Sequence, residues 1–194
     1  VSHKPLVEGV RGLEYRPPVA TMRSYLEKMQ GSPYTGRMPE AETPTVIAAL
    51  GPKMLALAAE QASGAHPYFT SPEHTRMARE VMGEGPLLCV EQKVICEENP
   101  EKARATARPV AKIYHMLPNY RNNWLRMGLT DSDIDDLSDR FIDATFAWGS
   151  MDQIRNRIQA HHDAGADHVC IQPIHPEMGM AVLDWDCLEA LSPN

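Results

Sequence analysis

Apolar residues recur with two different spacings between Thr45 and Thr70, and together they predict a strand, a helix and a second strand. TVIAAL is a short β-branched run, Gly51-Pro52-Lys53 is a tight turn, and MLALAAEQAS places its apolar residues on one helical face. Gly64-Ala65 ends the helix and the short run HPYFT follows. This order is typical of the units that build parallel sheets.

A helix that ends at Gly-Ala and is followed by a short strand occurs a second time, later in the chain. IRNRIQAHHDA predicts a helix, Gly165-Ala166-Asp167 ends it, and HVCIQPI predicts a buried strand. The recurrence indicates a repeating β/α architecture, in which chemistry lies at the carboxyl ends of the strands.

The remaining pattern predicts elements along most of the chain. Val1–Pro18 is expected to be a long loop. Pro109 is expected to kink or divide the helix that begins after Asn99. The aromatic and basic segment Asn119–Met127 is either a lid or dimer contact, or a solvated connection between helices. The expected strands are Thr45–Leu50, Ala65–Phe69, Leu87–Cys96 and His168–Ile174, and the expected helices are Val19–Met29, Lys53–Ala62, Pro72–Met82, Pro100–Leu117, Thr130–Trp148, Met151–Ala164 and Leu183–Leu191.

Composition excludes several classes of protein. The 194 residues suffice for one sizeable core, and we expect residues 1–194 to form a single domain. The net charge of −7 argues against a nucleic-acid footprint. No apolar run approaches the ~18 residues that a membrane span needs. The four cysteines show no CxxC spacing, which favours buried free thiols in a reducing compartment, hence a cytoplasmic protein.

The turn Leu50-Gly51-Pro52-Lys53 is the first candidate site. It joins a strand to a helix amino terminus, where free amides and the helix dipole attract anions such as phosphate. Gly51 would let a ligand approach the backbone closely, and Lys53 adds positive charge. The alternative is an ordinary turn without a ligand.

Histidines supply the other candidates. His3 would follow a strand and could act as general acid or base, or it could be an exposed loop residue. His66 could line a pocket or simply pack within its strand. His161, His162 and His168 do not form a metal site, because the first two point about 100° apart on a helix. No metal is expected.

The start of the sequence affects how much of the fold we expect. The chain opens at Val1, without an initiator Met and on a turn-like segment. We therefore expect the amino-terminal part of a larger domain to be absent.

Several segments together carry a family resemblance. ATMRSYLEKM, ALGPKMLALAAE, EQKVICEENPEKARATAR, LPNYRNNWLRMG and AGADHVCIQP resemble the luciferase-like oxidoreductases, and most closely their branch that depends on coenzyme F420. The resemblance runs in order over nearly all residues. It implies a (β/α)8 TIM barrel that lacks its first three β/α units, with Val1 at the end of the fourth strand.

The resemblance also implies a function and a site. It places Val1, Ser2 and His3 beside the cofactor ring, with His3 as proton donor. Some relatives have an acidic residue at the position of His3. Ala49, Leu50, Gly51 and Pro52 would face the ribityl-phosphate side of the cofactor.

The implied activity is hydride transfer between F420 and a small organic substrate, by a cytoplasmic homodimer with no nucleic-acid or membrane partner. The alternatives are an FMN-dependent monooxygenase and a non-catalytic barrel fragment.

Overall fold

A parallel sheet organises the chain, as the sequence predicts. The computed structural model describes residues 3–37, 39–41 and 43–192. Within this part the strands are β1 (Val46–Ala48), β2 (Gly64–His66), β3 (Leu87–Ile95), β4 (Phe146–Trp148) and β5 (His168–Pro173). All pair in parallel. β1 and β2 are shorter than expected because only Val46–Ala48 and Gly64–His66 pair with a neighbouring strand, and β2 begins one residue earlier than expected.

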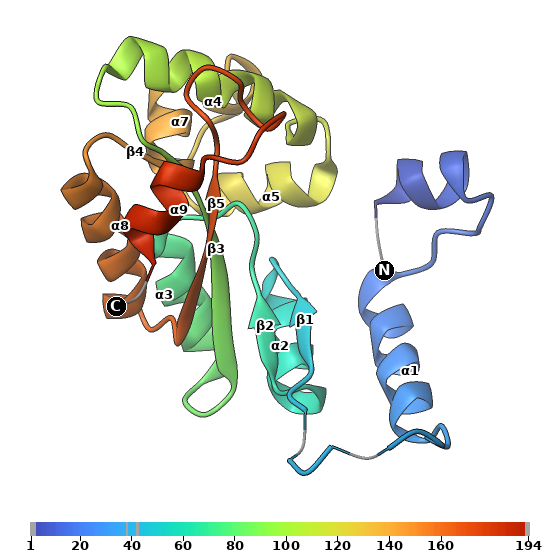
Figure 1. Ribbon diagram of the computed structural model, residues 1–194. Helices are drawn as coiled ribbons and strands as arrows, with labels where there is room; N and C mark the ends of the chain where they lie inside the picture. Colours follow the sequence, from blue (N-terminus) through green and yellow to red (C-terminus); the bar gives the residue numbers. More distant parts are fainter. Residues whose placement is uncertain (1–2, 38, 42, 193–194) are drawn as a thin grey trace.

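The long strand β3 is the centre of the sheet. β2 pairs with its first residues, and β5 pairs with Cys89–Val94. β4 pairs with Lys93–Ile95, so β4 and β5 flank the same residues on opposite edges. Figure 1 shows β3 rising past the shorter strands to the end of the molecule where α4, α5 and α7 lie.

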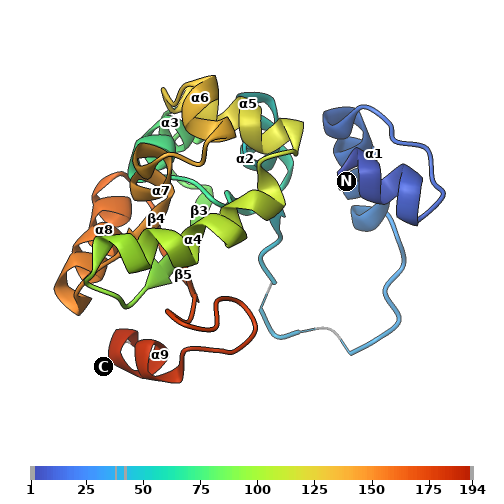
Figure 2. The same cartoon turned by 90° about the horizontal axis from the view of Figure 1, so that it is seen from above.

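Helices cover one face of the sheet. These are α2 (Pro52–Gln61), α3 (Pro72–Met82) and α8 (Met151–Asp163), and α1 (Pro18–Gln30) packs against α2. Leu88 and Val90 of β3 share a core with Ala58 of α2 and Ala78 of α3. Alternate residues of a strand point to opposite faces, so Glu91 and Lys93 lie on the other face. In Figures 1 and 2, α1 lies at the side of the molecule away from α8.

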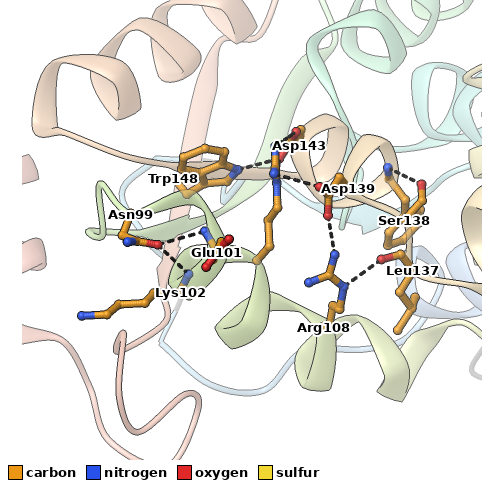
Figure 3. Close-up of polar contacts among 11 residues, drawn as sticks. Asn99, Glu101, Lys102, Arg108, Leu137, Ser138, Asp139, Asp143 and Trp148 are labelled. Carbon is orange, nitrogen blue, oxygen red and sulfur yellow. Dashed lines mark hydrogen bonds and ion pairs between the residues drawn. The ribbon is translucent and has the colours of Figure 1, made fainter.

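A second core lies beyond the carboxyl ends of the strands. It joins α4 (Pro100–Tyr114), α5 (Pro118–Arg126), α6 (Asp131–Asp135) and α7 (Asp139–Thr145). Arg104 of α4 pairs with Asp139 and Asp143 of α7. Figure 3 shows Arg108 beside Leu137 and Asp139, and the Trp148 indole donating to Asp143. These contacts fasten α4 to α7.

The single helix expected over Thr130–Trp148 is wrong. Leu137 adopts a left-handed backbone, with φ of 47°, and this breaks the helix. Ser138 then caps α7, accepting a hydrogen bond from the Phe141 amide at 3.2 Å. Phe146–Trp148 pairs with β3 instead of continuing the helix, because the sheet edge supplies its backbone hydrogen bonds.

Of the two alternatives for Asn119–Met127, the solvated connection is wrong. The segment forms α5, with Tyr120, Asn123 and Trp124 buried. The Trp124 indole donates to the Phe69 carbonyl at 3.1 Å. α5 therefore packs over the carboxyl ends of the strands, which is the position expected of the lid in the other interpretation.

Smaller differences concern the two ends and one proline. Within the expected loop Val1–Pro18, Pro5–Val10 forms a short π-helix without buried residues. Pro109 lies inside α4 without dividing it. The last helix, α9, spans Trp185–Leu191. No helix in the described ranges has both the length and the apolar character that crossing a membrane requires.

The cysteines differ partly from expectation. All four are free thiols, as predicted. Cys170 is exposed and not buried, because it lies on the face of β5 opposite the helices. Cys187 is buried, and Cys89 and Cys96 are half-buried.

Candidate functional site

The predicted turn lies where β1 passes into α2. Ala49 is buried in the core shared with the covering helices. Its side chain therefore points away from the opposite face of the sheet, which carries Glu91 and Lys93 and is called the open face below. Leu50 packs against the second core, Gly51 is half-buried and Pro52 is exposed at the first position of α2. Val1 and Ser2 lie outside the described residues.

Gly51 faces a cation that sequence reasoning missed. Its φ of −87° is open to any residue, so the backbone does not require glycine. A Cβ built there would lie 3.7 Å from the guanidinium of Arg126, at the end of α5. Within the described residues Arg126 is exposed and makes no ion pair, and α2 has no side-chain cap. Open backbone, a helix amino terminus and a guanidinium thus converge, which is the chemistry that holds phosphate.

A hydrogen bond from His74 holds the backbone of this turn. It lies in the first turn of α3, is buried, and its Nε2 lies 2.9 Å from the Leu50 carbonyl oxygen. Burial lowers the pKa of His74, and the nearby Arg126 lowers it further. The neutral ring therefore donates Nε2–H to Leu50 and fixes the backbone just before Gly51.

A buried ion pair lies on the open face of β3, near its carboxyl end. The Lys93 ammonium is fully buried, 3.1 Å and 3.2 Å from the two Glu91 carboxylate oxygens. It also lies 3.7 Å from the ring centre of Tyr68 and 4.1 Å from that of Phe69. Burial lowers the pKa of Lys93 to about 8, against the opposing effect of Glu91. The Phe69 amide donates to Glu91 at 2.9 Å, so the carboxylate is held from two sides.

Phenol groups lie above this pair. The Tyr68 hydroxyl donates to Gln172 of β5 at 2.8 Å and lies 3.0 Å from the Tyr114 hydroxyl. Burial raises the pKa of both Tyr68 and Tyr120, so these phenols stay protonated. Neither phenol therefore acts as an anion, and the Tyr68 proton is already donated to Gln172.

His3 reaches the same group of aromatic rings. Its ring centre lies 5.7 Å from that of Tyr120, which packs in turn against Tyr68 and Tyr114. Tyr120 and Arg126 both belong to α5. One helix therefore connects the candidate proton donor with the candidate anion site.

The sequence holds a signal for the ion pair. EQK places Glu91 and Lys93 two residues apart on one face of a strand whose other residues, apart from Gln92, are apolar. A buried charge must find a partner, so this alternation indicates an interior pair. Arg126 gave no comparable signal, because only the packing of α5 brings it to Gly51.

The other candidates are dispersed. His161 binds Thr75 and Gln92, His162 binds the Ala166 carbonyl, and His168 is exposed. The three histidines do not meet. His66 is half-buried, with Nδ1 2.7 Å from the Cys89 carbonyl oxygen.

Comparisons with known proteins identify the group to which this arrangement belongs. The family described as luciferase-like monooxygenase matches residues 6–168. No curated protein matches the sequence. Among solved structures, an F420-dependent secondary alcohol dehydrogenase in complex with an F420-acetone adduct has a TM-score of 0.61 and 15% identity, over 88% of this chain and 61% of its own.

Two further structures are similar. The coenzyme F420-dependent tetrahydromethanopterin reductase from Methanopyrus kandleri has a TM-score of 0.54 and 16% identity, over 92% of this chain and 63% of its own. Apo-MsnO8 has a TM-score of 0.54 and 19% identity, over 98% of this chain and 66% of its own. This chain thus spans less than two thirds of each.

The predicted architecture is confirmed: an α/β fold with a parallel sheet, corresponding to part of a luciferase-like barrel. The strand–turn–helix unit at Gly51 and the segment LPNYRNNWLRMG both fall within the matched range. The chain therefore belongs to the luciferase-like monooxygenase family of oxidoreductases.

Proposed function

We propose that this protein is an oxidoreductase that transfers a hydride between coenzyme F420 and a small organic substrate. The observation that carries the proposal is the open Gly51 backbone facing the Arg126 guanidinium at the start of α2. F420 has an anionic phosphate-bearing tail that this chemistry suits. Two of the similar structures are F420-dependent enzymes, which supports the choice of cofactor.

Each part of the proposed site has its own role. Gly51, the first turn of α2 and Arg126 would hold the anionic tail. The bound deazaflavin supplies a ring carbon that accepts or releases a hydride. His3 takes the proton that leaves a substrate hydroxyl when the adjacent C–H bond gives up its hydride, and returns it in the reverse direction.

A titration tests the cofactor. We expect the full chain to bind F420, measured by quenching of its fluorescence, with no comparable binding of FMN. Tight FMN binding without F420 binding would instead support the FMN-dependent monooxygenase. A monomer that binds neither would support the non-catalytic fragment. The homodimer and the cytoplasmic location stay predictions that the mass in solution and cell fractionation would check.

A pair of variants tests the anion site. Arg126→Met should weaken F420 binding at least tenfold, which corresponds to about 1.4 kcal/mol. Arg155→Met removes an exposed arginine of α8 and should leave the affinity unchanged. Equal affinities of the two variants would remove Arg126 from the site.

A further inference from the structure

Three groups with metal-binding chemistry meet away from the proposed cofactor site. Cys96 directly follows β3, while Asp184 caps α9 and Cys187 lies in its first turn. One ligating atom from each, the two Sγ atoms and a carboxylate oxygen, all lie within 4.8 Å of one another. The segments are distant in sequence, so packing of α9 against the end of β3 brings them together.

The surroundings leave the carboxylate without a compensating charge. Asp184 is buried, and one of its oxygens accepts the Cys187 amide at 3.0 Å. No ion pair found among the described residues involves Asp184. Cys187 is 1% exposed, in a small core with Val94, Ala147 and Ile154. A buried carboxylate without a cation is costly, and two neighbouring thiols cannot neutralise it.

We propose that Cys96, Asp184 and Cys187 bind a soft divalent cation, with zinc as the best match. Thiolates select zinc among the common divalent metals, and carboxylate oxygen is a regular third ligand. Binding releases one proton from each thiol, so the two thiolates and the carboxylate surround the dication with a net charge of −1. A water molecule takes the fourth tetrahedral position on the half-exposed side of Cys96.

The geometry fits with a small adjustment. Bond lengths of about 2.3 Å to sulfur and 2.0–2.2 Å to oxygen place two tetrahedral sulfur ligands roughly 3.8 Å apart and a sulfur and an oxygen roughly 3.5–3.7 Å apart. Because the three atoms already lie within 4.8 Å of one another, they need to approach by roughly 1.3 Å at most. Such a movement shifts only α9, a helix of 7 residues.

This site is independent of the cofactor site. Cys96 shares the helix-covered face of β3 with Val94, whereas Lys93 lies on the opposite face. The cation would fasten α9 to the central strand. Binding of the cation can therefore be measured whether or not F420 binds.

Cobalt provides the direct test. Reduced, metal-free protein is titrated with Co²⁺, and thiolate coordination is read as a charge-transfer absorption in the near ultraviolet. We expect saturation at one equivalent in the wild type and in Cys170→Ser, which removes the exposed thiol. Cys96→Ser and Cys187→Ala should abolish the band, and Asp184→Asn should weaken binding at least tenfold. No band in the wild type, or a band that survives both cysteine substitutions, would overturn the proposal.

A second measurement needs no variant. Stoichiometric Zn²⁺ should slow the alkylation of Cys96 and Cys187 in the wild type relative to that of Cys170, as followed by peptide mass. Equal protection of all three thiols, or none, would count against the site. If the protein is isolated with a Cys96–Cys187 disulfide and takes up no metal even after reduction, the metal proposal is wrong. The two cysteines would then form a redox pair.

Discussion

The Lys93 ammonium and the Glu91 carboxylate form an ion pair in the interior, 3.1 Å apart, with side chains 0% and 3% exposed. They stand two residues apart on β3 and point to the same face of the sheet. Rings of Tyr68, Phe69 and Tyr114 surround the ammonium. The pair is thus isolated from water, and each charge depends on the other.

Removing one member of this pair should destabilise the protein strongly. Lys93→Met leaves the Glu91 carboxylate buried without its cation, which costs about 3–5 kcal/mol. The double variant Lys93→Met/Glu91→Gln should regain more than half of that loss, because no charge then remains unpaired. Urea unfolding followed by circular dichroism measures both values. A double variant no more stable than the single one would show that the pair does not act as a unit.

Stability should fall as the pH drops below 6.5, and His161 should account for much of the change. Its ring is buried between Thr75 and Gln92, and burial, followed by the charge of Arg157, lowers its pKa to about 4. The unfolded chain takes up this proton near pH 6.5, so the stabilisation is complete above that pH. It is lost between pH 6.5 and 4, by up to about 3 kcal/mol.

The free energy of unfolding measured from pH 7 to pH 4.5 checks this prediction. His161→Gln should flatten the dependence of the free energy of unfolding on pH. Burial also lowers the pKa of His74, so part of the slope should persist in the His161 variant. An unchanged slope in His161→Gln would disprove the assignment.

Gly64 should tolerate no side chain. It belongs to β2, where a Cβ would collide with the Leu87 carbonyl oxygen and lie 2.7 Å from the Leu87 Cβ, in the strand with which it pairs. Gly64→Ala therefore forces β2 and β3 apart. We expect a loss of roughly 2–4 kcal/mol, in the range of damaging core substitutions. The matched control is Gly9→Ala, which meets no atom within 4 Å and should remain within about 0.5 kcal/mol of the wild type.

Two substitutions of Gly51 should separate the effect of side-chain size from the effect of charge on cofactor binding at the proposed anion site. Gly51→Ala adds a methyl group at ordinary contact distance from Arg126, so cofactor affinity should change little. Gly51→Asp places a carboxylate where the phosphate would lie, and Arg126 would pair with it. Affinity for F420 should then fall tenfold or more, about 1.4 kcal/mol per factor of ten. Unchanged affinity in Gly51→Asp, measured by fluorescence titration, would locate the cofactor elsewhere.

Local sequence determined the elements whose hydrogen bonds close within a few residues. Ser150 and Gln153 form a capping box at the start of α8, and Thr130 and Asp133 form another at the start of α6. Gly165 follows α8 with φ of 100°, a conformation that favours glycine. The strand–helix–strand unit at Thr45–Phe69 was predictable from the local spacing of its apolar residues, although its strands pair with residues distant in the chain.

Tertiary structure decided everything that depends on partners distant in the chain. Phe146–Trp148 became a strand because β3 offered an edge, and Gly64, expected only to end a helix, proved to be a paired strand residue. The sites depend on packing in the same way, since α5 brings Arg126 to Gly51 and α9 brings Cys187 to Cys96. Propensities and caps act over one or two turns, whereas such contacts exist only once a whole core has assembled.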